Sequence, residues 1–234
     1  GVGLITATPE NQIGAEKYWG CSSSMMCEVG LPPVSAQRPK ARKCNEPLRL
    51  AWAGLHLPGK ALNLALYSLA KLPKTITWEL HVLGQGERTN YWQHLARQLG
   101  VAERCRFAGW LPREEAINIM ASSHLMLITS LRDLTSTVTV EALSLGLPIV
   151  CLDHCGFAGV VNDKCGIKVP VTTPEEVEIS LADAIASLAN NEALRFELAE
   201  GAVLRAQDFS WGKKAAAVEE IYRRKLAAHE AIQV

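Results

Sequence analysis

The stretch HLMLITSLRDLTSTVTVEALSLGLPIVCL, residues 124–152, decides the fold. Its first apolar run, Leu125–Thr129, is typical of a strand that is buried on both faces. After a polar loop, Thr137–Leu145 is apolar on nearly every side, which is the pattern of a buried helix. A glycine and a proline end that helix, and a second apolar run, Ile149–Leu152, follows. Strand, helix and strand in this order indicate a parallel α/β sheet.

The same alternation continues on both sides of this stretch. Further strands are predicted at Leu48–Gly54, Ile76–Val82 and Cys105–Ala108. Helices are predicted from about Pro58, at Arg88–Leu99, at Arg113–Ala121 and after the start signal Thr173-Pro174-Glu175-Glu176, with two more beyond it. The sequence therefore predicts a Rossmann-like, doubly wound parallel sheet, in which ligands bind at the carboxyl ends of the strands.

The composition changes once along the chain, in a segment rich in proline and in basic side chains that has almost nothing to bury. Before it, one short strand at Gly3–Thr6 and a polar helix at Glu10–Tyr18 are too little for a domain, or for the second wall of a cleft. We therefore expect four parts: a domain remnant at residues 1–30, a linker at 31–47, a ligand-binding domain at 48–209 and a last helix at 210–234.

Composition and charge limit the classes of function. Hydrophobic residues make up 48% of the 234, enough for a full core. The 24 basic residues equal the 24 acidic ones, which argues against a dedicated nucleic-acid binder. No apolar run approaches the roughly 18 residues of a membrane-spanning helix. Seven cysteines, an odd number in a chain of this length, favour a reducing compartment, so we expect a cytoplasmic protein.

Two loops at the predicted carboxyl ends carry unusual residues. The first, from Gly54 to Lys60, places a lysine in the first turn of a helix, at the unfavourable end of the helix dipole. Lys60 is therefore either a solvated surface lysine or a cation that shares a bound phosphate with the helix N-terminus. In the second, Gly84 and Gly86 either let a ligand approach the backbone or simply end a strand.

The third loop is the most informative. Glu141 is a carboxylate in a buried helix and needs a hydrogen-bonding or charged partner. Asp133 lies eight residues earlier, and the hydroxyls and free backbone amides of Thr135, Ser136 and Thr137 offer an anion cradle at the helix start. In the structural alternative, Asp133 is a turn residue, the hydroxyls are helix caps and Glu141 pairs with a basic side chain.

Two other groups of residues favour structural roles. Metal-ligand side chains gather at Cys151, Asp153, His154, Cys155 and Cys165, but their spacing matches no standard zinc pattern. We expect no metal and no other cofactor; Cys151 ends a buried strand, and Asp153–Gly159 forms another loop at the ligand crevice. The tryptophans in or beside strands are expected in the core rather than as a stacking platform, namely Trp52, Trp78 and Trp110.

These motifs together resemble the retaining, GT-B-type group 1 (family 4-like) glycosyltransferases, in their C-terminal domain. The spacing Asp133-x7-Glu141 is similar to the acidic-x7-Glu motif of that family. The resemblance covers nearly the whole chain after the linker. It extends to Gly54…Lys60 for the phosphate loop, Gly84-Gln85-Gly86 for the Gly-x-Gly turn, Phe107-Ala108-Gly109-Trp110 for the loop beside the nucleobase, Phe209-Ser210-Trp211 for the closing helix and Glu28-Val29-Gly30-Leu31-Pro32 for the interdomain segment.

The resemblance implies a role for each matched residue. Glu141 would accept hydrogen bonds from the ribose hydroxyls of a sugar nucleotide, Asp133 would lie near the donor sugar, and Lys60 would neutralise the diphosphate leaving group. The backbone amides of Thr135–Thr137 would add to that neutralisation. The chain departs from the family at Leu55, where the phosphate loop carries arginine, and at Leu134-Thr135-Ser136, which replaces a Gly-Phe-Gly-like turn; its first acid is Asp rather than Glu.

The resemblance implies the donor-binding half of a hexosyltransferase, active as part of a longer chain and inactive alone. Its partners would be a nucleoside-diphosphate sugar and, through a missing N-terminal domain, an acceptor sugar or lipid-linked sugar; no nucleic acid is expected. Peripheral attachment of the full chain to the inner face of the membrane is compatible with such an acceptor. The alternatives are a nucleotide-binding module without turnover, consistent with Leu55, and an interaction protein that reuses the fold.

Overall fold

A computed structural model gives the fold of residues 4–32, 40–43 and 46–230. Its main sheet has six parallel strands in the order β5-β4-β3-β6-β7-β8. Their bounds are β3 Leu48–Ala53, β4 Trp78–Leu83, β5 Cys105–Gly109, β6 Leu125–Ile128, β7 Ile149–Leu152 and β8 Gly166–Val169. The chain winds outward from β3 in one direction and then returns to add β6 on the other side. This is the predicted Rossmann-like, doubly wound topology.

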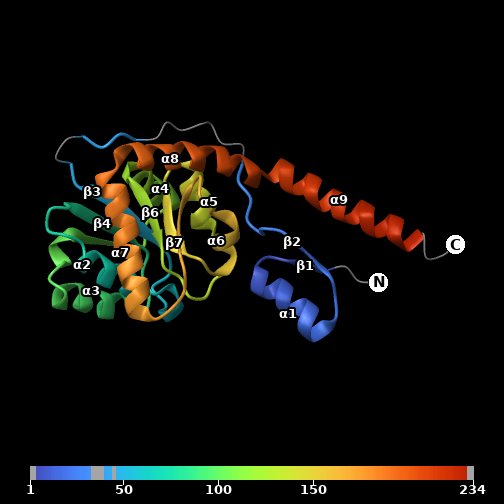
Figure 1. Ribbon diagram of the computed structural model, residues 1–234, viewed down its shortest axis with the longest axis horizontal. Helices are drawn as coiled ribbons and strands as arrows, with labels where there is room; N and C mark the ends of the chain where they lie inside the picture. Colours follow the sequence, from blue (N-terminus) through green and yellow to red (C-terminus); the bar gives the residue numbers. More distant parts are fainter. Residues whose placement is uncertain (1–3, 33–39, 44–45, 231–234) are drawn as a thin grey trace.

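Helices flank the sheet, as the alternating pattern predicts (Figure 1). One group of contacting helices is α2, α3 and α7, and a second is α4, α5 and α8. Their bounds are α2 Leu62–Ala70, α3 Thr89–Gln98, α4 Arg113–Ser122, α5 Thr137–Ser144, α6 Cys155–Val160, α7 Pro174–Asn190 and α8 Glu192–Ala206, with short 3-10 turns η1 Pro58–Lys60, η2 Ala102–Arg104 and η3 Gln207–Phe209. The predicted start of α7 is confirmed, because Thr173 and Glu176 form a capping box.

Three local predictions need correction. The helix expected from Pro58 is broken at Ala61, whose φ of +46° separates the turn η1 from α2. The stretch expected as a loop, Asp153–Gly159, contains the short helix α6, and the strand β8 was not predicted. Buried β6, α5 and β7 agree with their predictions to within a residue at each end.

The residues before the linker form a separate small unit. Strands β1 (Leu4–Thr6) and β2 (Ser23–Met25) pair in parallel around helix α1 (Pro9–Trp19). This unit lies beside the last helix, α9 (Trp211–Glu230), which projects away from the main sheet (Figure 1). None of the helices in the described ranges combines the length and apolar character that crossing a membrane requires.

The segment predicted as a solvated linker is attached to the main domain at two points. Leu31 is buried and pairs with Ser210, next to the start of α9. Arg42 donates a backbone hydrogen bond to Glu192 Oε1 and a side-chain hydrogen bond to the carbonyl oxygen of Ala189. The expectation that this segment has almost nothing to bury is therefore wrong at Leu31. Two of its four prolines, at positions 33 and 39, lie outside the described residues.

Candidate functional site

The loops after β3 and β6 meet at the point where the winding direction of the sheet reverses, which is where such sheets bind ligands. The buried hydroxyl of Thr129 joins them: it accepts a hydrogen bond from Trp52 Nε1 at 3.1 Å and donates one to the carbonyl oxygen of Lys60 at 3.1 Å. The amide of Leu131 donates to the carbonyl oxygen of Gly59 at 2.8 Å. The two loops therefore form one rigid rim of the crevice.

The structure brings two of the predicted site residues into direct contact. The ammonium group of Lys60 forms an ion pair with Oδ2 of Asp133, and both side chains are mostly buried. Lys60 ends the turn η1, so it does not lie in the first turn of an α-helix, as the sequence suggested. The cation assigned to the phosphates and the acid assigned to the donor sugar thus neutralise each other.

The third predicted residue, Glu141, pairs with a basic side chain, as the structural alternative expected, but the partner, Arg113, was not predicted from the sequence. Its carboxylate is buried in α5, and Oε1 accepts hydrogen bonds from Nε of Arg113 at 3.1 Å and from Nη2 at 2.6 Å. The Arg113 side chain is 74% exposed. Arg113 opens α4, so it is a cation at the unfavourable end of a helix dipole, the same signal that singled out Lys60.

The predicted anion cradle is partly occupied by the chain itself. Oε1 of Glu28 accepts from the amide of Thr135 at 2.8 Å, and Oε2 accepts from its hydroxyl at 2.7 Å. The amide of Thr135 is therefore not free to bind an anion. The amides of Ser136 and Thr137 remain as donors at the start of α5, because the first amides of a helix have no partner within it.

The glycines of the second loop serve loop packing. A Cβ atom on Gly84 would collide with the carbonyl oxygen of Gly54, and Gly84 also has a φ of +110°. A Cβ atom on Gly86 would lie 2.8 Å from the carbonyl oxygen of His56. These contacts press the loop after β4 against the loop after β3, so the backbone that these glycines approach closely is the protein's own.

His56 lies beneath these loops in an aromatic cluster that the sequence analysis did not identify. Its ring is fully buried, 5.6 Å from the ring of Trp52 and 5.1 Å from that of Trp92. Nδ1 lies 2.8 Å from Oγ1 of Thr89, whereas Nε2 has no hydrogen-bond partner in the described part of the chain. Burial lowers the pKa of His56, so the ring is neutral and supports the loop as an apolar group.

The tryptophans divide into two kinds. Trp52 and Trp78 are buried, as predicted. Trp110 is 67% exposed, so its predicted place in the core is wrong. The reason is that β5 ends at Gly109, whose φ of +72° turns the chain outward before the indole.

A cavity of about 530 Å³ opens beside the Lys60–Asp133 pair. Its lining includes Thr8, Glu10 and Asn11 from the start of α1, Leu131, Arg132, Asp133 and Leu134 from the loop after β6, and His154 and Cys155 from α6 and its cap. Nδ1 of His154 lies 3.4 Å from Oε1 of Glu10. The unit before the linker therefore does supply part of a second wall, contrary to the expectation from its size.

The cysteines near this crevice are packing residues. Cys151 lies within β7, fully buried, and burial raises the pKa of its thiol to about 12. Cys165 is buried next to β8. Gly156 of α6 packs against Thr135, where a Cβ atom would lie 2.7 Å from the threonine hydroxyl oxygen. No three His, Cys, Asp or Glu side chains of the described residues are grouped so that they could hold a metal ion.

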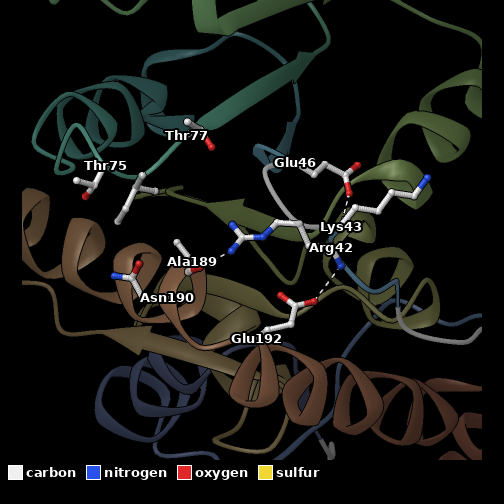
Figure 2. A pocket seen from close by; sticks show the side chains of 9 residues that line it. Arg42, Lys43, Glu46, Thr75, Thr77, Ala189, Asn190 and Glu192 are labelled. Carbon is white, nitrogen blue, oxygen red and sulfur yellow. Dashed lines mark hydrogen bonds between the residues drawn. The ribbon is translucent and has the colours of Figure 1, made fainter.

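A second hollow, of about 350 Å³, lies at the other end of the sheet (Figure 2). It is lined by Arg42, Lys43, Glu46, Thr75, Ile76, Thr77, Ala189, Asn190 and Glu192. These residues precede β3 and β4 or join α7 to α8, so the hollow is at the amino ends of the strands. The guanidinium group of Arg42 points across it to the carbonyl oxygen of Ala189, and the backbone amide of Arg42 donates to Glu192, so both bonds fix the end of the linker (Figure 2).

Comparisons with known proteins agree with this fold and crevice. The family described as "Glycosyl transferases group 1" matches residues 34–205. D-inositol 3-phosphate glycosyltransferases are similar in sequence: that of Saccharomonospora viridis is 30% identical over 76% of this chain and 43% of its own length, and that of Corynebacterium glutamicum is 27% identical over 62% and 34%. The chain thus spans less than half of these curated relatives.

Solved structures share the fold at low sequence identity. Sucrose-phosphate synthase from Thermosynechococcus elongatus superposes with a TM-score of 0.78 at 18% identity, covering 97% of this chain and 59% of the synthase chain. The Anabaena protein HepE, solved in complex with UDP, superposes with a TM-score of 0.74 at 16% identity, covering 96% of this chain and 63% of its own. The glycosyltransferase WaaG has a TM-score of 0.72 at 22% identity, covering 92% and 62%.

Proposed function

Because the chain belongs to the group 1 glycosyltransferases, we propose that it is the donor-binding half of an enzyme that transfers a hexose from a nucleoside-diphosphate sugar to an acceptor with retention of configuration. The observation that carries the proposal is the convergence of Lys60, Asp133 and the start of α5 at the reversal point of the sheet. A cation and free helix amides at one point are what a diphosphate leaving group needs.

Each residue of the crevice then has a distinct task. Glu141 would bind the ribose hydroxyls through Oε2, since Arg113 occupies Oε1. On donor binding, Lys60 would turn from Asp133 to the diphosphate, and Asp133 would then face the donor sugar. The amides of Ser136 and Thr137 would complete the phosphate site.

The loops around the base fit the same proposal. Gly54, Gly84, Gly86 and Gly109 lie at the carboxyl ends of β3, β4 and β5, where their backbone would approach the nucleotide, and the exposed indole of Trp110 would be available to a nucleobase. We expect transfer to need no added metal, because Lys60 and the helix amides supply the neutralisation that a divalent cation gives elsewhere. The acceptor, a sugar or a lipid-linked sugar, would be bound by a part of the enzyme outside these residues.

The test is nucleotide binding by variants of the two central residues. Calorimetry with UDP is the first measurement, because the neighbour HepE was solved with UDP; GDP and ADP follow. Glu141→Gln is expected to weaken binding by about 1–3 kcal/mol, since the amide loses charge-assisted acceptance from ribose hydroxyls. The matched control is Glu197→Gln, on the exposed face of α8. Unchanged affinity of a folded Glu141→Gln variant would make Glu141 a purely structural carboxylate.

Lys60→Ala separates phosphate binding from nucleoside binding. The ammonium group should contact phosphate charge and neither base nor ribose, so the diphosphate should lose affinity and the nucleoside should not. Added salt should reduce the difference between wild type and variant, because the charge pair is partly exposed. Equal losses for both ligands would place Lys60 away from the phosphates.

A second candidate function is a nucleotide-binding module without turnover. The observation that favours it is Leu55, half exposed at the position where the family's phosphate loop carries arginine. Transfer by a longer protein that contains this chain would decide for the enzyme, and binding without transfer would decide for the module.

A further inference from the structure

Charges around the crevice are paired, with one exception. Lys60 pairs with Asp133, Arg113 with Glu141, and His154 lies beside Glu10. Arg132 also lines the cavity of about 530 Å³, and its side chain is exposed. Among the described residues, the ion pairs around this cavity do not include Arg132. It is therefore the cation that remains uncompensated where the phosphates of a sugar nucleotide would lie.

The backbone fixes Arg132 directly against the phosphate loop. Its amide donates to the carbonyl oxygen of Gly59 at 3.3 Å, beside the stronger bond from Leu131. A Cβ atom built on Gly59 would lie 3.3 Å from the Cβ of Arg132, so the two loops touch at this point. Arg132 thus projects from the rim that carries Lys60, although the two residues are far apart in sequence.

A further cation would add to the neutralisation of the leaving group that Lys60 and the helix amides provide. A diphosphate carries several negative charges, and Lys60 can contact them only after it breaks its ion pair with Asp133. Leu55 offers no charge from the loop after β3. A guanidinium group can also bind two phosphate oxygens at once, which an ammonium group cannot do in a fixed geometry.

We propose that Arg132 is a phosphate-binding residue of this site, supplying from the loop after β6 the charge that Leu55 leaves out of the loop after β3. The inference rests on the proposed function, because it presumes a nucleoside-diphosphate ligand. It adds a residue to the site and explains how a chain with Leu55 still holds a diphosphate.

The experiment compares diphosphates with their nucleosides by calorimetry: UDP with uridine, GDP with guanosine and ADP with adenosine. Arg132→Ala should bind the preferred diphosphate about tenfold more weakly, the change expected on losing one charge-assisted hydrogen bond, and the nucleoside unchanged. Arg132→Lys should fall between the two, because it keeps the charge and loses the planar fork. The matched control, Arg97→Ala on the exposed face of α3, should bind like wild type.

A compensating variant makes the test sharper. Adding Leu55→Arg to Arg132→Ala should restore most of the lost diphosphate affinity, because the new arginine supplies a guanidinium group from the loop after β3. If the double variant binds the diphosphate as weakly as Arg132→Ala alone, an arginine at position 55 does not replace Arg132, and the proposal that Arg132 compensates for Leu55 is contradicted. Circular dichroism and thermal unfolding verify that each variant is folded.

The outcomes separate this inference from the proposed function. If Lys60→Ala weakens diphosphate binding and Arg132→Ala behaves like Arg97→Ala, the proposed function stands and the role of Arg132 is overturned. Equal losses for nucleoside and diphosphate in Arg132→Ala would also overturn it. If the chain binds none of the three diphosphates, the proposed function fails and the inference fails with it.

Discussion

Ser136 has a backbone conformation that suits glycine. Its φ of +65° and ψ of 120° lie in a region that L-residues rarely occupy. Ser136 stands where the Gly-Phe-Gly-like turn of the group 1 glycosyltransferases has its second glycine. The strain costs about 1–3 kcal/mol, partly offset in a glycine variant by the larger entropy of its unfolded chain. Ser136→Gly should therefore raise the free energy of unfolding by about 1 kcal/mol in urea denaturation.

The control for Ser136→Gly is the same substitution in a helix. Ser187 lies inside α7, so Ser187→Gly should lower the free energy of unfolding by about 0.5–1 kcal/mol. If both variants lose stability alike, the positive φ of Ser136 carries no strain that glycine relieves.

The buried side chain of His124 should make the free energy of unfolding depend on pH. It is buried at the start of β6, where Nδ1 accepts from the amide of Arg49 at 2.9 Å. Burial, with the neighbouring Arg49 and Arg195, lowers its pKa to about 4. As pH falls, the unfolded chain takes up the proton near pH 6.5 and the folded chain only near 4. The free energy of unfolding should therefore fall across this window, by about 3 kcal/mol at most.

Urea denaturation at several pH values measures this dependence, with His124→Asn as the comparison. The asparagine oxygen can still accept from the amide of Arg49, but it does not titrate. The variant should be less stable at pH 7 and show a shallower decline toward pH 4. The remaining slope belongs to other groups whose pKa values are lowered in the fold, among them the buried His56 and His81 and the hydrogen-bonded carboxyl group of Glu46. A slope as steep as that of wild type would mean that His124 does not set it.

The site residues themselves could be found from the sequence, but their partners could not. Lys60, Asp133 and Glu141 stand out because a charge at a helix start or in a buried helix is unusual. Which charges meet depends on the approach of loops remote in sequence, as with Arg113 and Glu141. The exposure of Trp110 likewise depends on the positive φ of Gly109, and the hydrophobic pattern of the sequence does not predict a backbone dihedral angle.

At the scale of elements, segments with a clear apolar pattern were predictable and segments without one were not. The strands β6 and β7 are buried throughout and α5 is buried from Thr139 to Leu143, so their apolar composition marks them. The strand β8 reads GIKV, and the helix α6 reads CGFAGV with two glycines, so neither has a periodic pattern. Both exist because of their neighbours: β8 pairs along its whole length with β7, and α6 packs against the loop at Thr135.

Glu28 links the segment before the linker to the start of α5. Both of its oxygens accept hydrogen bonds from Thr135, so the carboxylate holds the loop that presents the remaining amides. In Glu28→Gln, only one side-chain oxygen remains to accept from the amide and the hydroxyl of Thr135, and an NH2 group takes the place of the other. We expect faster hydrogen exchange in a peptide covering residues 133–137 and a loss of about 1 kcal/mol in unfolding free energy.

The matched control is Glu16→Gln, on the exposed surface of α1, which should leave both measurements unchanged. Exchange in residues 133–137 that is the same in Glu28→Gln and wild type would show that the loop holds its shape without Glu28.

At the scale of the whole molecule, the small unit and α9 expose several large apolar side chains. Tyr222 and Leu226 on α9 are 64% and 63% exposed, and Tyr18 and Trp19 on α1 are 73% and 72% exposed. Apolar side chains gathered on the small unit and on α9 mark surfaces that bind other protein segments. Curated relatives are more than twice as long as the region they share with this chain, which leaves room for such segments.

We therefore expect these 234 residues to bind a nucleoside diphosphate weakly and to transfer no sugar on their own. Transfer requires donor and acceptor to be held together with water excluded. The described residues give the cavity beside Asp133 one wall from the main domain and only a short one from α1. The assay offers several sugar nucleotides to this chain and to a longer protein that contains it, and measures product and free diphosphate. Equal turnover by both would show that the crevice between α1 and the main domain is already a complete active site.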